Sequence, residues 1–481
     1  MKKNLLLFIC AFVAQLAFAQ AQAVKGTVLD SSGEPVIGAT VKVLGTKQAT
    51  VTDIDGNFTI QEVSPNASIN ISYVGMQPVT LKASGNLNVT LKDDFQNLND
   101  VVVIGYGSAK AKDLTSPITV IKAADIKSTP STSPMTALQG KVAGVNVVSS
   151  GTPGSGPTVR IRGTGSFANS SPLYVVDGMF YDDINFLNNE DIQEMSILKD
   201  ASAAAIYGVR AANGVVLITT KKGTKNQKAQ ITYDGYIGIQ KATNVLEMAN
   251  SQEYATMLME ANYDAYSPTM KAAIDRFGGS YADSDFHKWT YGADTDWYKE
   301  LLRTAVITNH SVGISGGSDK ATYSLGISYL YQDGIMDTEN NYKRLNFRAA
   351  VDYDATNWLK VGFNGVFSKS DQVLPNNAAW QQAFNTPGII PVFDEQNTQA
   401  FPDKYASPSS IGLSTNFKNP VATAKYYDAK NELRQYMTNF YAQINLLPQK
   451  LNFKTNISYN FQDINGSVFT PTYYVSDSQQ S

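Results

Sequence analysis

The chain has 481 residues, which is too long for one typical domain, and 43% of its residues are hydrophobic. Its formal net charge is −3, and lysine and arginine form no cluster along it, so we expect no nucleic-acid partner. Its 26 tyrosines and 21 phenylalanines are a rich aromatic supply for membrane girdles or for surfaces that stack on sugars.

Residues 1–19 have the features of a secretory signal peptide. Two lysines precede an apolar run from Leu5 to Phe18, and a small-x-small site follows, so we expect cleavage between Ala19 and Gln20. The apolar run is shorter than the ~20 residues that a membrane helix needs. Cys10 is the only cysteine and lies in this run, so the mature chain is expected to form no disulfide.

Residues 23–94 alternate short Val/Ile/Thr runs with turn clusters, which predicts a small β-sandwich. The region resembles the carboxypeptidase-regulatory-like domain. Asp53-Ile54-Asp55-Gly56 is similar to the start of a calcium loop, but its glycine stands at the fourth loop position instead of the sixth. Ser64 occupies the twelfth position, where such a loop needs glutamate. We therefore predict a hairpin turn and no metal.

Residues 95–107 form a linker, polar at its start, and residues 108–222 are predicted to form a mixed α+β domain. Six apolar runs of strand length alternate there with short helical stretches: 118–121, 145–148, 159–161, 173–176, 195–198 and 215–219. The clearest helix is expected over Ala201–Tyr207, with Asp200 as its N-cap and Gly208 at its end.

Several motifs follow one another in residues 137–222. They include VRIRG at Val159–Gly163, PLYVVDG ending at Asp177 and Gly178, and DIQEMSILKDASAAAIYG. Over more than eighty residues, this region resembles the plug domain of TonB-dependent outer-membrane transporters, specifically the SusC/RagA-like nutrient importers of Bacteroidetes. The resemblance implies a plug inside a β-barrel in the cell outer membrane, with the domain at 23–94 ahead of it.

The segment Asp100-Val101-Val102-Val103-Ile104 resembles the TonB box of this family, and the resemblance implies that it binds the periplasmic energy transducer TonB. An extended, β-prone segment can add as a strand to the sheet edge of a partner through main-chain hydrogen bonds. The alternative is a buried core strand, which an isolated run of VVVI would favour. Its place after a polar linker and before the plug favours TonB binding.

Three further plug motifs have both structural and functional interpretations. The resemblance implies that Arg160 and Arg162 pack the plug against the barrel, and Asp352 and Asp354 are their candidate partners; direct ligand binding is the less favoured alternative. The glycine-rich stretch 151–156 lacks the lysine of a phosphate-binding loop, so we predict a plug loop. Asp177, followed by Gly178, is interpreted as a turn former and not as a catalytic acid.

Residues 229–481 contain seven segments in which apolar and polar residues alternate with period two. In 321–331, for example, the odd-numbered residues are apolar or aromatic and most of the even-numbered ones are small or polar. Each segment has close to the 9–11 residues that a tilted strand needs to cross a bilayer. The segments are 231–240, 306–315, 321–331, 344–355, 358–369, 436–446 and 451–461.

The connections between these segments alternate in length. Short ones (316–320, 354–357 and 447–450) alternate with longer ones (241–304, 332–343 and 370–435). Membrane barrels have short periplasmic turns and long outer loops, so we expect the first strand to rise from the periplasm. The predicted fold is mainly β: a β-sandwich, an α+β plug and the first strands of an incomplete transmembrane β-barrel. A soluble sandwich is the alternative that alternation alone would allow.

Seven strands are too few for a bacterial barrel, which uses an even number, and plugged transporters use about 22. An open sheet would leave unpaired backbone groups in lipid. We therefore expect that the chain is an N-terminal fragment of a transporter or a truncated reading frame.

Catalytic and metal-binding patterns are missing from the sequence. The two histidines, His287 and His310, fit no metal-ligand spacing, and no nucleophile–base pair can be assembled. We expect no enzyme activity, no metal and no cofactor. Aromatic residues of the long connections have three interpretations, namely stacking on sugars, packing within the loops or lining the membrane interface: Tyr254, Tyr263, Tyr266, Trp289, Tyr291, Trp297 and Trp380.

The resemblance implies TonB-dependent active import of large nutrients across the outer membrane, with a SusD-like surface lipoprotein as partner and outer-membrane lipid around the barrel. Oligosaccharides and peptides both remain open as ligands. The alternatives are a secreted β-sandwich adhesin or carbohydrate-binding protein, a passive porin, which would need no plug, and a non-functional truncated transporter.

Overall fold

The computed structural model describes residues 22–30, 33–44, 46, 48–64, 67–73, 76, 78–91, 101–104, 107–110, 118–127, 129–164, 170–447 and 451–481. The predicted cleavage site at Ala19 and Gln20 and the linker up to Asp100 lie outside these residues. The chain divides into two compact units, one of which contains the N-terminal domain and the other residues 103–108 and 115–481. In the described ranges, no helix is long and apolar enough to cross a membrane.

The N-terminal domain is a sandwich of two sheets, as predicted. One sheet has the order β4-β1-β7 and the other β3-β2-β5-β6. The strands are β1 (Gln22–Leu29), β2 (Thr40–Val43), β3 (Ala49–Val51), β4 (Asn57–Val63), β5 (Ser68–Ser72), β6 (Val79–Lys82) and β7 (Asn86–Thr90). Alternate residues such as Val28, Val41 and Ile69 fill the core between the sheets because successive side chains of a strand point to opposite faces.

The Asp53 loop is a turn, but not a hairpin turn. The Asp53 carboxylate accepts hydrogen bonds from the backbone N of Asp55 (3.0 Å) and of Asn57 (2.8 Å), and Gly56 has a φ of 74°. These contacts stabilise the turn from within, as Asp side chains commonly do. The prediction was wrong in one respect, because β3 and β4 belong to different sheets.

The plug, residues 118–220, is an α+β domain built on a five-stranded sheet of order β10-β15-β16-β13-β14. Each predicted apolar run coincides with a strand. The strands are β10 (Ile118–Lys122), β11 (Asn146–Val148), β12 (Thr158–Arg160), β13 (Leu173–Val176), β14 (Met179–Tyr181), β15 (Ile192–Leu198) and β16 (Val215–Thr220). The helical elements are α3 (Ala123–Lys127), η2 (Thr136–Leu138), η3 (Asn189–Asp191), α4 (Ala201–Ala204) and η4 (Ala205–Ala211).

The helix predicted over Ala201–Tyr207 is only partly α-helical. It tightens into a 3₁₀ helix at Ala205, and Gly208 breaks the helical geometry with a φ of 66°. Asp200 stands at the N-cap position, but its side chain makes no capping hydrogen bond, so the predicted cap was wrong in this respect.

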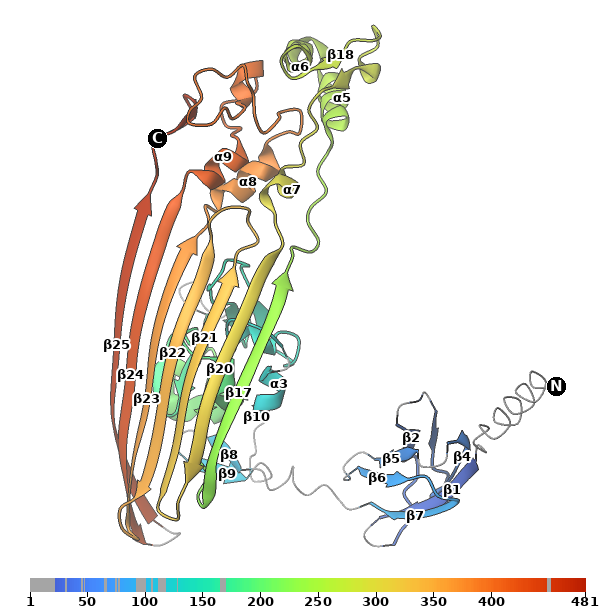
Figure 1. Ribbon diagram of the computed structural model, residues 1–481, viewed down its shortest axis with the longest axis vertical. Helices are drawn as coiled ribbons and strands as arrows, with labels where there is room; N and C mark the ends of the chain where they lie inside the picture. The colour runs from blue at the N-terminus through green and yellow to red at the C-terminus, as the bar shows by residue number, and fades with distance from the viewer. Residues whose placement is uncertain are drawn as a thin grey trace, which may run out of the picture. The chain divides into compact units, whose positions relative to one another are not determined.

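The chain then forms a seven-stranded antiparallel sheet, called the wall below, in which every strand pairs with the next one in sequence (Figure 1). Its strands are β17 (Gln227–Gln240), β20 (Ala305–Gly317), β21 (Ala321–Asp333), β22 (Asn341–Asp354), β23 (Leu359–Leu374), β24 (Asp428–Leu447) and β25 (Leu451–Phe469). All seven predicted segments are strands. They are longer than predicted, because hydrogen-bonded pairing continues at one end into polar stretches such as Asp428–Gln435 that lack strict alternation.

The two faces of the wall are inverted relative to those of a soluble sheet. On β21 the apolar side chains Leu325, Ile327 and Tyr329 are 38–50% exposed, whereas the polar Ser324 and Ser328 are buried. A soluble sandwich buries its apolar face, so the soluble alternative fails on this observation.

Aromatic residues follow one register row of the outward face. Neighbouring rings are in contact, with centroids 4.8 Å apart for Phe367 and Tyr436 and 6.1 Å apart for Tyr436 and Phe461. The next row toward the loops is charged on β23–β25, where it consists of Lys369, Arg434 and Asp463. This row, called the aromatic row, has five aromatic and two aliphatic members: Tyr233, Val312, Ile327, Phe347, Phe367, Tyr436 and Phe461.

The apolar band crosses the sheet on a slant. On β17 the outward apolar residues run from Ile231 to Ile239, and on β25 they run from Leu451 to Phe461. From β17 to β25, the centre of the band shifts toward the short turns by about seven residues relative to the aromatic row, which is ~23 Å along the strands. The two strands are six strand spacings apart, or ~29 Å across the sheet. The strands are therefore tilted by about 40° from the normal to the band, within the range of transmembrane barrels.

A substitution at Ile327 tests the position of this apolar band. Replacing Ile327 with lysine puts a charge at its middle and is expected to cost about 2–4 kcal/mol of folding stability in membranes. Asn465→Lys on the same outward face lies among charged residues and should cost less than ~1 kcal/mol. Urea unfolding in lipid vesicles measures both, and equal costs would contradict the proposed band.

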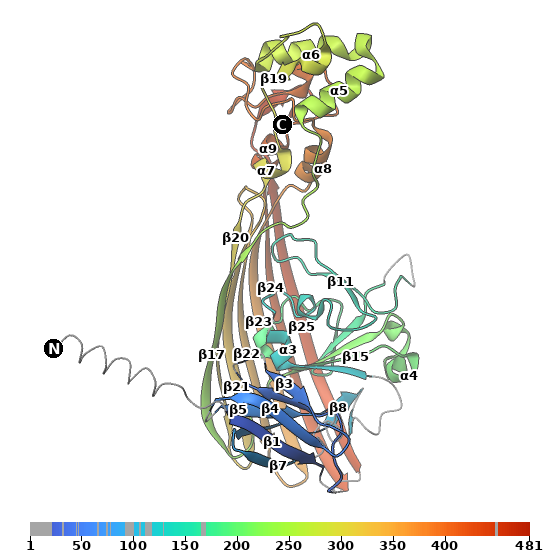
Figure 2. The same ribbon diagram turned by 90° about the vertical axis from the view of Figure 1, so that its right-hand side faces the viewer.

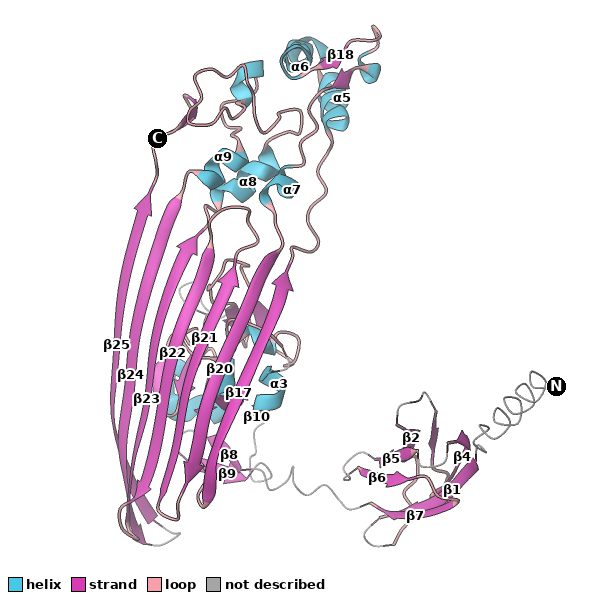
Figure 3. Ribbon diagram, in the orientation of Figure 1, coloured by secondary structure: helices cyan, strands magenta, loops and turns pink. Residues whose placement is uncertain are grey.

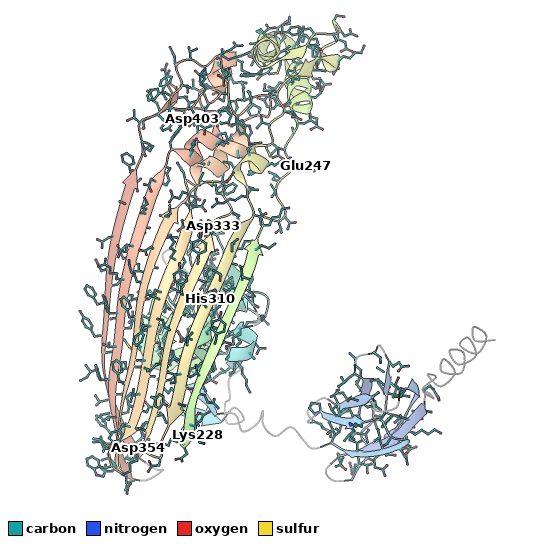
Figure 4. All side chains as sticks on the ribbon, in the orientation of Figure 1. Lys228, Glu247, His310, Asp333, Asp354 and Asp403 are labelled. Carbon is teal, nitrogen blue, oxygen red and sulfur yellow. The ribbon has the colours of Figure 1, made fainter. Side chains whose placement is uncertain are left out.

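The long connections fold into a helical lobe at the end of the wall opposite the short turns (Figure 3). Figure 4 places Lys228 and Asp354 at the short-turn end and Asp333 at the other. Trp289 and Trp297 are buried in the core of the lobe, so they pack the loops. The lobe contains α5 (Ser251–Ala261), α6 (Tyr263–Phe277), β18 (Gly279–Ser280), η5 (Phe286–Lys288), β19 (Thr290–Tyr291), α7 (Trp297–Leu301), α8 (Ala378–Asn385), η6 (Pro408–Ile411), α9 (Pro420–Lys425), β26 (Tyr474–Ser476) and β27 (Gln479–Gln480).

Candidate functional site at the plug and wall

The plug lies against the polar face of the wall (Figure 2). Alternate residues of β22 make the central contacts. The Arg344 guanidinium donates to the carbonyl oxygens of Thr132 (3.2 Å) and Asn185, and Asn346 Nδ2 donates to the Phe186 carbonyl at 2.6 Å. These contacts join side chains of the wall to backbone carbonyls of the plug, so they position the plug whatever side chains it carries there.

Arg348 forms the most buried ion pair between wall and plug. Its Nε lies 2.9 Å from Asp191 Oδ1, and the two side chains are only 4% and 9% exposed. The same guanidinium donates to the Lys221 carbonyl at 2.6 Å and to Ser324 Oγ at 2.8 Å. A buried charge is stable only when it is paired and hydrogen-bonded in this way.

On one side of Arg348, the plug meets the wall through a polar contact with β17, β20 and β21. Lys127 Nζ, at the end of α3, lies 2.7 Å from Asp234 of β17 and 2.8 Å from Glu190 of the plug. Burial alone would lower the pKa of Lys127, but its hydrogen bonds to Asp234 and Glu190 outweigh burial and raise the pKa above the usual value.

A cavity of about 250 Å³ lies in this polar contact. Most of the wall residues that line it are small, namely Thr232, Ser311, Gly313, Ser315, Ser324 and Gly326, and Asp234, Ile314, Leu325 and Arg348 complete the wall side. The plug contributes Glu190, Asp191, Gln193, Lys221 and Lys222. The space is large enough and polar enough to hold several water molecules.

On the other side of Arg348, the plug meets β23 and β24 through apolar side chains. Met437 belongs to the hydrophobic core of the plug, and Val366 packs against that core together with Met179. Only about 20 Å³ of free space remains between these groups, little more than one water-sized probe would fill. This contact is therefore close-packed, with the polar side chains of Asn364 and Asn439 at its border.

The glycine-rich plug loop at 151–156 contacts the wall through its backbone. Gly154 N donates to Gln332 Oε1 at 2.9 Å, and Gln372 Nε2 donates to the Pro153 carbonyl at 2.5 Å. Gly154 has a φ of 71°, and a Cβ added to it would overlap the ring of Tyr342. The loop needs glycine here because the wall approaches its backbone closely.

Gly154→Ala is expected to loosen this contact by about 2–4 kcal/mol, because backbone strain adds to the overlap with Tyr342. Gly151→Ala is the matched control. Gly151 has a similar φ of 77° but open space around it, so its change should cost about 1 kcal/mol. Hydrogen exchange of residues 150–156 measures both variants, and equal protection in the two would contradict the role of Tyr342.

Arg160 and Arg162 do not pair with the wall residues expected of them. Both are exposed, and Arg162 Nε donates to the Lys199 carbonyl of the plug at 2.7 Å. Gly163, which follows them, has a φ of 75°. The proposed pairing with Asp352 and Asp354 was wrong, because Arg160 ends the β11–β12 hairpin of the plug and Arg162 bonds within the plug.

The predicted partners Asp352 and Asp354 bind lysines instead. Asp352 lies 3.2 Å from Lys360 and 3.7 Å from Lys222, and Asp354 pairs with Lys225. Two of these lysines belong to the segment that joins the plug to β17. The ion pairs therefore fix that segment to the end of the wall with the short turns.

Asp177 and Gly178 form the two-residue turn between β13 and β14, with φ values of 49° and 89°. Positive φ at both positions is the geometry of a type I′ hairpin turn, which favours Asp-Gly. The Asp177 carboxylate also accepts hydrogen bonds from Thr220 N (3.1 Å) and Thr220 Oγ1 (2.6 Å). The interpretation of Asp177 as a turn former agrees with these contacts.

The candidate TonB box lies in β8 (Val101–Ile104), which forms a two-stranded sheet with β9 (Gly107–Lys110). Its first residue, Asp100, lies outside the described residues. The backbone of β8 is extended, and β9 is its only hydrogen-bonded neighbour in the described part of the chain. A two-stranded sheet leaves the outer edge of each strand free to accept another strand.

The described residues contain no cluster of three or more metal-ligating side chains. His310 lies on the outward face, where its ring nitrogens lie 2.7 Å from Tyr233 OH and 2.9 Å from Thr308 Oγ1. These hydroxyls stabilise a polar ring within the apolar band of β20. His287 lies in the lobe, 3.9 Å from Glu260.

The roles of Arg348, Asp191 and Lys127 were not predicted from the sequence. The available signal was the presence of Arg344 and Arg348 among the polar residues of a strand whose other face is apolar. Charges on the inner face of a wall need partners from whatever fills its interior. Their identity depends on the position of the plug, which one sequence does not contain.

Comparison with known proteins agrees with this architecture. Residues 110–215 match the TonB-dependent receptor plug domain, and residues 24–103 match the carboxypeptidase-regulatory-like domain. The TonB-dependent receptor SusC of Bacteroides thetaiotaomicron is 36% identical over 436 residues, which cover 87% of this chain and 41% of SusC. The TonB-dependent receptor P3 of Formosa agariphila is 32% identical over 479 residues, covering 98% of this chain and 45% of that protein.

Among solved structures, the RagAB peptide importer in its open-open state is similar to this chain. The TM-score is 0.62 and the identity 29%, over 77% of this chain and 43% of the matched chain. The chain thus spans less than half of the length of the relatives it matches. It belongs to the SusC/RagA-like TonB-dependent receptors of the outer membrane, which are not enzymes.

Proposed function

We propose that the full protein imports large nutrients, oligosaccharides or peptides, across the outer membrane, with energy supplied by TonB. One observation carries the proposal. The wall has an apolar band on its outward face, and its polar inward face holds a separate domain, the plug, through charged contacts. A passive pore needs no such domain. An adhesin needs no apolar outer band.

The proposed TonB contact is the segment Asp100–Ile104. TonB would add a strand to the free edge of β8, and force along the chain would then reach β10, the first strand of the plug. Main-chain pairing explains why a short segment with simple side chains suffices.

The proposed partner on the outer side is a SusD-like surface lipoprotein. One relative is described as the RagAB peptide importer, which is consistent with a two-component assembly. The helical lobe is the part of this chain that such a partner would meet, because it lies at the end of the wall with the long connections.

Uptake in a deletion strain tests the proposal. Cells that carry the intact gene should accumulate a labelled oligosaccharide or peptide mixture, and a protonophore should stop accumulation. The class that accumulates identifies the ligand. Uptake that continues at the same rate with the protonophore would support a passive pore instead.

A further inference from the structure

The contact between plug and wall is asymmetric. Toward β17, β20 and β21 it consists of charged and hydroxyl groups, some buried and some partly exposed, around a cavity of about 250 Å³; we call this the polar seam, defined by Lys127, Asp234, Glu190 and Ser311. Toward β23 and β24 it is apolar and close-packed; we call this the apolar seam, defined by Met179, Val366 and Met437. Arg348 lines the cavities of both seams and lies between them.

The two seams differ in the free energy needed to separate the plug from the wall. Opening the apolar seam exposes close-packed side chains to water, which is unfavourable in proportion to the area exposed. Opening the polar seam exposes groups that already adjoin a polar cavity, and the Lys127–Asp234 pair is 29% and 37% exposed before any movement. Partly hydrated ion pairs contribute little to stability.

The chain path also leads to the polar seam. β10 is an edge strand of the plug sheet, and β15 is its only strand partner among the described residues, through five residue pairs. Among its side chains only Ile121 is buried. The element after β10 is α3, and its last residue, Lys127, makes the ion pair with Asp234 on the wall.

We propose that the plug turns about the apolar seam, that its first opening is along the polar seam, and that the Lys127–Asp234 pair is the latch that holds this seam closed. The passage so formed is lined by hydroxyl, glycine and charged groups, and therefore suits hydrated, polar solutes. The proposal rests on the proposed function only for the origin of the force; the order in which the seams open is a property of this chain.

The order can be measured without TonB. The mature chain is expected to lack cysteine, so single cysteines report on one position each. Ser311→Cys lies in the polar seam and Val366→Cys in the apolar seam, both on the inward face of the wall. The full protein in outer-membrane vesicles is treated with a hydrophilic maleimide at increasing urea concentrations, and each labelling rate is compared with its own rate without urea.

We expect labelling at Ser311→Cys to accelerate at lower urea concentration than at Val366→Cys. Acceleration at both positions together, or at Val366→Cys first, would overturn the proposal. Asp234→Asn, which removes the latch, should raise labelling at Ser311→Cys about two- to fivefold. Asp403→Asn is the matched control, because Asp403 also binds a lysine, Lys425, but lies in the lobe. If Asp234→Asn raises labelling no more than the control Asp403→Asn does, the Lys127–Asp234 pair is not a latch.

A second arm separates this inference from the proposed function. The same two cysteines are labelled in energised cells with and without TonB. Preferential labelling of Ser311→Cys that requires TonB supports both proposals. If the urea order holds but TonB changes neither rate, the seam asymmetry stands and TonB-driven import is wrong.

Discussion

Replacing Val102 with proline is expected to reduce energised uptake by the full protein about tenfold or more, while insertion into the outer membrane stays normal. Proline lacks the backbone N–H that a strand donates to its neighbour, so it prevents strand addition in the middle of β8. The wall and the plug do not depend on β8, which forms its own two-stranded sheet with β9.

Val102→Ala is the control for this prediction, since alanine keeps the N–H donor and shortens the side chain. Its uptake should stay within about twofold of the parent, because strand addition relies on main-chain hydrogen bonds. Uptake of labelled nutrient and the amount of protein in outer-membrane fractions are measured together. Normal uptake by Val102→Pro would exclude residues 100–104 as the TonB-binding segment.

Replacing Arg348 with methionine is expected to destabilise the plug within the wall by about 3–5 kcal/mol, because it leaves the buried Asp191 carboxylate without its counter-charge. It also leaves the Lys221 carbonyl without its guanidinium donor. The released plug should let a large antibiotic that normally cannot cross the outer membrane enter the cell.

Arg434→Met is the matched control for Arg348→Met. Arg434 also pairs with a carboxylate, Glu432 at 2.6 Å, but on the exposed outer face of the wall, so its loss should cost less than ~1 kcal/mol. The double variant Arg348→Met/Asp191→Leu should recover most of the stability, because it removes the unpaired charge. Urea unfolding of the plug and antibiotic sensitivity report the two effects, and an Arg348→Met plug as stable as that of Arg434→Met would contradict the buried pair.

Period-two alternation predicted the seven wall strands and their two faces because each strand meets two different environments along its whole length. The ends of the strands were harder to predict. Beyond the apolar band, β24 continues through Asp428–Gln435, where the outward face is charged, the inward face mixes polar and apolar residues, and backbone pairing continues. Side-chain pattern carries no signal for such pairing.

The plug–wall contacts were beyond the reach of the sequence. Arg348 and Asp191 are 157 residues apart, and nothing local to either residue indicates the other. Arg160 and Arg162 were assigned to the wall by the family resemblance, yet both are exposed and Arg162 binds a plug carbonyl instead. Long-range ion pairs follow from the packing of domains, whereas the turn at Asp177-Gly178 was predictable because its conformation is set by the two residues themselves.

Accessibility scanning along β21 tests most directly whether the wall faces lipid on one side and a plug-filled interior on the other. Nitroxide labels at successive positions from Ser324 to Tyr329, in the full protein in lipid vesicles, are exposed to oxygen and to a water-soluble nickel complex. We predict that labels at Leu325, Ile327 and Tyr329 collide with oxygen, while those at even positions are shielded from both reagents. Odd positions that collide with nickel instead would mean that this face lies in water, and would contradict the assignment of the wall to the membrane.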